Sequence, residues 1–95
     1  MRRSGAWMTQ LDERILEYLV GEPWASPAEL ASHRAIRATE AIVRERCRFL
    51  VDAELAAYVA GPESDMVEIT TWGVGYLHGD IDAAHRWPTR RVLRG

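Results

Sequence analysis

The sequence contains no lysine, since all 12 of its basic residues are arginine. The planar guanidinium of arginine binds phosphate groups and guanine edges through two parallel hydrogen bonds, which suits a nucleic-acid partner. A GC-rich or salt-adapted genome would also replace lysine by arginine. The absence of lysine therefore does not identify a partner by itself.

Cysteine is nearly absent as well, because Cys47 is the single one in the chain. One cysteine excludes an internal disulfide and fits a reducing compartment. No apolar run approaches the roughly 20 residues that a membrane-spanning helix needs. The start, "MRRSGAWMTQ", carries the charge of a signal peptide without the apolar stretch that follows in such peptides. We expect a soluble cytoplasmic protein without membrane contact.

No repeat, low-complexity tract or linker divides the 95 residues, so one small domain is expected. The chain shows no glycine-rich phosphate loop and no pattern of a nucleophile beside a base. We therefore expect no catalytic residues, no cofactor and no small-molecule substrate. His78, Asp80, Asp82 and His85 are possible metal ligands, but their spacing matches no zinc or calcium loop. No metal site is predicted.

Three helices are predicted in the first half of the chain, at about residues 11–20, 27–32 and 39–53. The residues expected to cap their N-termini are Thr9, Ser26 and Thr39. Gly21, followed by Pro23, is expected to end the first helix. In the third helix Val43, Cys47 and Leu50 fall on one stripe at helical spacing, which predicts that they face the core. Cys47 is accordingly interpreted as an inert core residue.

The periodicity changes after the third helix. Residues 55–60 and 66–70 read as two short strands joined by "GPESD", a β-hairpin. A short last helix over "TTWGVGYLHG" would pack Trp72, Tyr76 and Leu77, although its two glycines are unfavourable. The predicted fold is α+β, a winged helix-turn-helix with three helices, a two-stranded β-hairpin wing and a short C-terminal helix. Its parts are an N-terminal arm (1–8), the domain (9–83) and a basic C-terminal tail (84–95).

Positive charge gathers around the third helix: from His33 to Leu50 there are five arginines against two glutamates, in a chain of net charge −2. A locally basic helix in an acidic body indicates a polyanionic partner. The alternative is a solvated face with pairs of the Glu40–Arg44 kind, each contributing only about 0.2–0.5 kcal/mol to helix stability. The two interpretations differ in whether Arg44 and Arg48 stay clear of the protein's own acids.

Four stretches carry a resemblance: "WMTQLDERILEYL" (7–19), "SPAELA", "VRERCRFL" and "ITTWGVGYLHGDIDA" (69–83). They match the pattern W-M-T-x-x-D-x-x-I-L-E, an R-C-R third helix and I-T-x-x-G-x-x-Y-L-x-G-x-x-D-A. The chain thus resembles the small haloarchaeal winged-helix regulators similar to the repressor of halophage phi-H. The resemblance implies an archaeal homodimeric transcription regulator, a repressor, that binds double-stranded DNA. Where that family has glycine after the third helix, this chain has Glu54. Either Glu54 takes an unfavourable left-handed conformation or the helix ends differently.

In a helix-turn-helix protein the third helix enters the major groove with its first two turns. The predicted DNA-binding residues are Arg37, Thr39, Glu40, Ala41, Arg44, Glu45 and Arg48. The residues predicted as possible phosphate contacts are Ser26, Arg2, Arg3, Arg34, Arg90 and Arg91. Arg46 lies nearer the core edge and is a weaker candidate.

The wing does not favour DNA, because its tip carries Glu63 and Asp65 and no arginine. Either the wing points away from DNA or it serves another contact. The alternative function is therefore a winged-helix module for protein–protein contact without specific DNA binding. Trp7, Trp24, Trp72 and Trp87 are interpreted as core and interface anchors.

Overall fold

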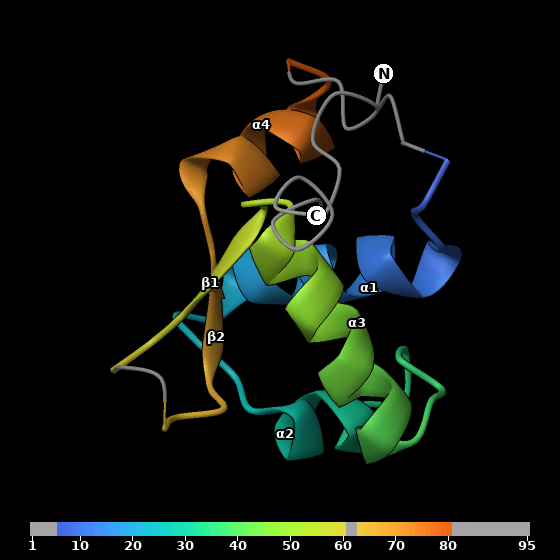
Figure 1. Cartoon of the computed structure of the whole chain (residues 1–95). Helices are drawn as coiled ribbons and strands as arrows, with labels where there is room; N and C mark the ends of the chain where they lie inside the picture. Colours follow the sequence, from blue (N-terminus) through green and yellow to red (C-terminus); the bar gives the residue numbers. More distant parts are fainter. Residues whose placement is uncertain (1–5, 61–62, 81–95) are drawn as a thin grey trace, which may run out of the picture.

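The computed structural model describes residues 6–60 and 63–80 and has the predicted winged helix-turn-helix architecture (Figure 1). The elements in chain order are α1 (Gln10–Gly21), α2 (Pro27–Ser32), α3 (Glu40–Asp52), β1 (Ala56–Tyr58), β2 (Val67–Ile69) and α4 (Thr71–His78). In the described ranges no helix is long and apolar enough to cross a membrane.

The helix starts follow from short-range side-chain chemistry. The Thr9 hydroxyl accepts a hydrogen bond from the backbone N–H of Asp12, and the Asp12 carboxylate accepts one of 2.8 Å from the Thr9 N–H. Ser26 and Glu29 form the same reciprocal capping box at α2. The Thr39 hydroxyl caps α3. All three predicted caps are confirmed, because each needs only residues within one helical turn.

Helix α1 ends one residue later than predicted. Gly21 is still helical, and the residue that leaves the helix is Glu22, in an extended conformation. The reason is Pro23, whose ring disfavours the helical conformation at the residue before it. A left-handed glycine is not needed to end this helix.

The wing is shorter than predicted, with three residues in each strand. The strands pair antiparallel in the register Ala56↔Ile69, Ala57↔Glu68 and Tyr58↔Val67. Ala25, between α1 and α2, adds an antiparallel bridge to Val67 on the other edge of β2 through hydrogen bonds of 2.9 and 3.0 Å. The hairpin lies on one side of α3, and its loop end points toward the end of the molecule that holds α2 (Figure 1).

One apolar core joins all four helices to the hairpin. Its largest fully buried side chains are Tyr76, Ile15, Leu16, Leu19, Leu30, Leu50, Leu55, Val43 and Val67. The predicted stripe of α3 is confirmed, since Val43, Cys47 and Leu50 are buried. Burial raises the pKa of the Cys47 thiol from 9.0 to about 12, so the nucleophilic thiolate is scarce at neutral pH.

The last helix packs through two of the three predicted residues. Tyr76 is buried and Leu77 is partly buried, as expected, but 46% of the Trp72 surface is exposed. The contact face of α4 centres on Gly73 and Tyr76, which leaves Trp72 at its edge. A Cβ at Gly73 would overlap the Leu55 carbonyl oxygen and lie 2.6 Å from Cγ1 of Ile69. Gly73, which is unfavourable for the predicted helix, is thus the residue that lets α4 pack closely against Leu55 and Ile69.

Of the two alternatives that the missing glycine leaves open, Glu54 adopts the left-handed conformation, with φ of 69°. The Glu54 N–H donates to the carbonyl of Val51, and its own carbonyl accepts a 2.7 Å hydrogen bond from the Thr70 hydroxyl. Because Thr70 caps α4, this turn connects the end of α3 to the start of α4.

Replacing Glu54 by glycine is expected to raise the free energy of unfolding by about 1 kcal/mol. Glycine adopts a positive φ without steric cost and keeps both backbone hydrogen bonds, although its greater freedom in the unfolded chain offsets part of the gain. Thermal unfolding should show a midpoint about 4–8 °C higher. Glu54→Ala serves as the control: it removes the same side chain but retains the strain, so the glycine variant should unfold at a higher midpoint than the alanine variant.

Candidate nucleic-acid interface

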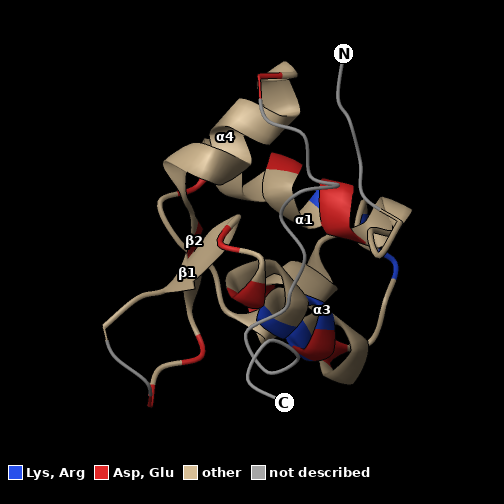
Figure 2. Ribbon diagram, turned by 45° about the horizontal axis from the view of Figure 1, so that its top comes forward, with Lys and Arg blue, Asp and Glu red and all other residues tan. Residues whose placement is uncertain are grey.

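The first turns of α3 present an exposed face on the side away from the core. The exposed residues of this face and of its entrance are Arg37, Thr39, Glu40, Ala41, Arg44, Glu45 and Arg48. Within the helix, Ala41, Glu45 and Arg48 lie opposite the Val43–Cys47–Leu50 stripe, and Glu40 and Arg44 lie to one side of it. Figure 2 shows both charge signs interspersed along α3. This face has the shape of a recognition helix, but its charge is mixed.

Arg44 is exposed but paired with the protein's own acids. Its Nη2 donates to Glu40 at 2.7 Å, and its Nη1 donates to Asp65 of the wing at 3.3 Å. These bonds, the Glu40 bond first, raise the pKa of Arg44 above its ordinary value. The pairing with Glu40 is of the kind that the solvated-face interpretation expects. The pairing with Asp65 shows that the C-terminal part of the wing loop contacts α3.

Arg48 differs from Arg44. Its side chain is exposed, and within residues 6–60 and 63–80 it forms no hydrogen bond or ion pair. Between α3 and the wing lies a hollow of about 300 Å³, whose lining includes Arg44, Arg48, Tyr58 and Asp65. Arg48 is therefore the cation of the helix face that a partner can reach without first displacing an acid.

Arg46 is a structural residue. Its guanidinium donates two hydrogen bonds, of 2.9 and 2.7 Å, to the carboxylate of the fully buried Asp12. It also donates to the carbonyl of Trp7 at 3.1 Å and lies 4.5 Å from the centre of the Phe49 ring. The hydrogen bond with Asp12 raises the pKa of Arg46. Sequence reasoning placed Arg46 nearer the core edge but did not predict its pair with Asp12.

The predicted phosphate contacts are only partly within the described residues. The Ser26 hydroxyl caps α2 by accepting from the Glu29 N–H at 3.1 Å, so its own hydrogen remains to donate to a phosphate. Arg34 is exposed in the connection between α2 and α3. The predictions for Arg2, Arg3, Arg90 and Arg91, as for the 1–5 part of the arm, Trp87 and the 84–95 tail, lie outside the described residues.

A metal site has no support in the part of the chain that the structure describes, where no three His, Cys, Asp or Glu side chains gather. His78 is exposed in the last turn of α4, and Asp80 follows that helix. Asp82 and His85 lie beyond the described residues.

One comparison with known proteins gave a match over nearly the whole chain. The crystal structure of the PhiH1 repressor-like protein from Haloarcula marismortui superposes with a TM-score of 0.84 at 38% sequence identity. The match covers 92% of this chain and 96% of that one. A scan of family models and a search of curated proteins found no match.

Proposed function

We propose, from the premise that the chain belongs to the family of PhiH1 repressor-like proteins, that it is a homodimeric transcriptional repressor that binds specific sequences of double-stranded DNA. The observation that carries the proposal is the face of α3 and its entrance, where every predicted DNA-binding residue is exposed. The major groove of B-DNA is about 12 Å wide and admits one α-helix. In this arrangement α3 enters the groove with its N-terminal turns first.

Arg48 is proposed as the main base-reading cation, because a free guanidinium can bind guanine O6 and N7 together. Thr39 and the unpaired backbone N–H groups of the first turn of α3 are proposed to bind a phosphate. Ala41 and the exposed Ile42 offer apolar contacts to thymine methyl groups.

In the proposed complex Arg44 exchanges its protein partners, Glu40 and Asp65, for acceptor groups of the DNA. Its bonds to Glu40 and Asp65 are solvent-exposed, and exposed ion pairs are weak because water and salt screen them. Approaching DNA supplies phosphate and guanine acceptors for the guanidinium and repels both carboxylates. We propose that Asp65 leaves Arg44 as the complex forms, so that the acidic wing tip moves away from the backbone.

The test of the proposal begins with selection of a preferred duplex from random 30-base-pair DNA. We expect Arg48→Ala to weaken binding to that duplex about tenfold, the loss of one arginine–guanine contact, without changing thermal stability. The control is Arg48→Lys, which should keep binding to scrambled DNA but lose the preference for the selected duplex. If no duplex is bound more tightly than scrambled DNA, the proposal fails; if Arg48→Ala binds like the wild type, the assignment to α3 fails.

A protein–protein module is the second candidate, favoured by two observations. The acids Glu40 and Asp65 already pair with Arg44, and Trp24 and Trp72 are about half exposed.

The salt dependence of the binding constant distinguishes the two candidate functions. Binding to DNA through about four to six phosphate contacts gives a plot of log K against log [salt] with a slope of about −4 to −5, whereas apolar docking is insensitive to salt.

The proposed homodimer requires a defined spacing between the two half-sites of its DNA. A two-fold dimer of helix-turn-helix domains binds two half-sites about 34–36 Å apart, or a multiple of that spacing. The selected duplexes should therefore contain an inverted repeat, and sedimentation of the free protein should give the mass of two chains.

A further inference from the structure

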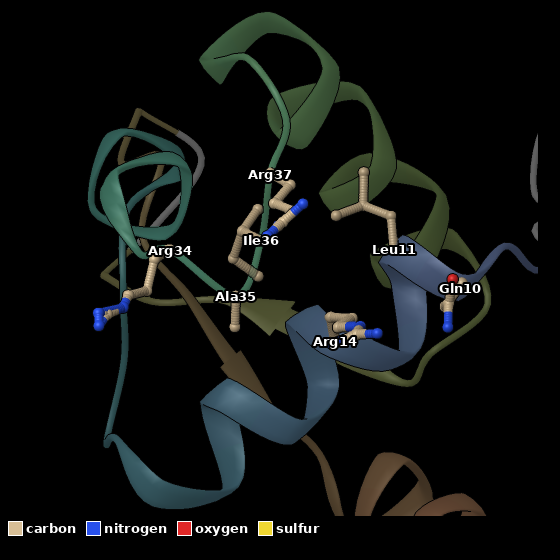
Figure 3. Close-up of a pocket in the computed structure, with 7 residues that line it drawn as sticks. All are labelled: Gln10, Leu11, Arg14, Arg34, Ala35, Ile36 and Arg37. Atoms are coloured by element: carbon tan, nitrogen blue, oxygen red, sulfur yellow. The ribbon is translucent and has the colours of Figure 1, made fainter.

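Three arginines line a second hollow, beside the entrance of α3. The hollow has a volume of about 630 Å³ and lies between the first turns of α1 and the α2–α3 connection. Arg14 comes from α1, and Arg34 and Arg37 come from the connection. In Figure 3 Arg14 and Arg37 extend over the space between the two segments, and Arg34 extends outward from its rim. We name this hollow the arginine pocket.

Among the described residues no carboxylate lines the arginine pocket, although Glu17 and Arg14 together line the adjoining hollow. Among the described residues the three guanidinium groups form no hydrogen bond or ion pair, in contrast to Arg44 and Arg46, which are held by acids. Cations that share one hollow repel each other, and an anion bound between them removes that repulsion. The pocket therefore favours an anionic ligand with several acceptor oxygens.

The backbone of Arg37 gives a second indication. Its φ is 54°, in the left-handed region where glycine or asparagine is the unstrained choice. An arginine in this strained conformation is explained if its guanidinium is needed to bind a ligand, since backbone strain concentrates at functional positions. The turn places that guanidinium beside the Gln10–Arg14 side of the arginine pocket.

The position of the arginine pocket relative to α3 indicates the ligand. The hairpin lies on one side of α3, and α1's first turns with the α2–α3 connection lie on the other side, in both Figure 1 and Figure 2. A helix in the major groove has a phosphate backbone on each side of it. The wing side carries Asp65, whereas the arginine pocket side carries three free cations.

We propose that the arginine pocket binds a phosphate group, and that its source is a backbone phosphodiester of the DNA whose major groove α3 enters. The assignment of this phosphate to DNA rests on the proposed function, whereas the binding of a phosphate group in the pocket does not. Arg14 and Arg37 donate to the phosphate oxygens, and Arg34 adds charge at the rim. The contact fixes the position of α3 in the groove and reads no base.

The first experiment measures binding of a mixed-sequence 30-base-pair duplex at several salt concentrations. The variants Arg14→Gln and Arg37→Asn each should weaken binding about three- to tenfold, and the double variant should reduce the magnitude of the salt slope by about 0.9. The preference for a selected over a scrambled duplex should stay unchanged. Because asparagine tolerates a left-handed φ, Arg37→Asn should not lower the unfolding midpoint, which separates loss of binding from loss of fold.

Thr71→Glu is the matched control. It lowers the net charge by one, as Arg14→Gln does, but in the first turn of α4, where an acid suits the helix dipole. In Figure 1 α4 lies at the opposite end of the molecule from α2. The control should leave the salt slope unchanged. Equal effects of Thr71→Glu and Arg14→Gln would overturn the proposal, since net charge alone would then explain them.

The second experiment titrates the protein with sodium pyrophosphate and follows the arginine Nε–Hε signals by NMR. Saturable shifts of Arg14 and Arg37, abolished in the double variant, support the phosphate pocket. If the wild type binds pyrophosphate in this way but binds no duplex, the regulator function fails, the DNA source is overturned and a free phosphate compound is the ligand. If the double variant binds duplex with wild-type affinity and slope, the arginine pocket proposal is overturned and the regulator function stands.

Discussion

Replacing Arg46 by alanine is expected to lower the free energy of unfolding by about 3 kcal/mol, because the fully buried Asp12 loses its only described cationic partner. This value is at the lower end of the range for broken buried ion pairs, about 3–5 kcal/mol, since 17% of the Arg46 side-chain surface is exposed. The loss is a large fraction of the stability of a small domain. We expect the variant to be largely unfolded near 40 °C.

The size of the effect follows from what Arg46 connects. Its two bonds to Asp12 link residues 34 positions apart and thereby join α3 to the start of α1. The bond to the Trp7 carbonyl extends the link to the segment before α1. Among the described residues, the capping bond with the Thr9 N–H is then the only hydrogen bond left to the Asp12 carboxylate, which is fully buried in the intact protein.

Denaturant unfolding of Arg46→Ala checks this prediction, with Arg48→Ala as the matched control on the same helix. Arg48→Ala removes an exposed guanidinium and should change stability by less than about 0.5 kcal/mol. The double replacement Asp12→Leu with Arg46→Met should recover much of the loss, because an apolar pair leaves no buried charge. Equal stabilities of Arg46→Ala and Arg48→Ala would contradict the structural role of Arg46.

Replacing Gly73 by alanine is expected to lower the free energy of unfolding by about 2 kcal/mol, although alanine is the better helix former by about 1 kcal/mol. The added methyl group would overlap the Leu55 carbonyl oxygen and crowd Ile69. That carbonyl accepts a 3.1 Å hydrogen bond from the Thr70 N–H, so it cannot move without disturbing the start of α4.

Gly21→Ala is the control for Gly73→Ala. Both glycines are helical, but nothing lies within 4 Å of a Cβ built at Gly21. Alanine there should raise the free energy of unfolding by about 0.5–1 kcal/mol. Thermal unfolding of both variants should therefore give shifts of opposite sign, and two upward shifts would show that α4 does not pack closely on Leu55.

The residues that carry the family resemblance explain the fold more than the DNA interface. Asp12 of the first motif and Arg46 of the R-C-R motif form the buried ion pair. Gly73 and Tyr76 of the closing motif hold α4 against the core. Arg48, the second arginine of the R-C-R motif, lies on the exposed face of α3.

The sequence alone determined the helix starts and the core stripe of α3, because each depends on residues within one or two turns. Caps and periodicities act at this range, so they can be predicted without knowing what lies opposite. The shortening of the strands and the exposure of Trp72 could not be predicted, since they depend on how far each element extends beyond the core.

Only the tertiary structure decided which arginines are free. Helical spacing set Arg46 nearer the core edge but did not separate Arg44 from Arg48. The fold pairs Arg44 with Asp65, 21 positions away, and Arg46 with Asp12, 34 positions away. The fold also brings Arg14 of α1 to Arg34 and Arg37, a grouping with no signal along the chain. An ion pair depends on the distance between two charges in space, and for residues on different elements packing alone sets that distance.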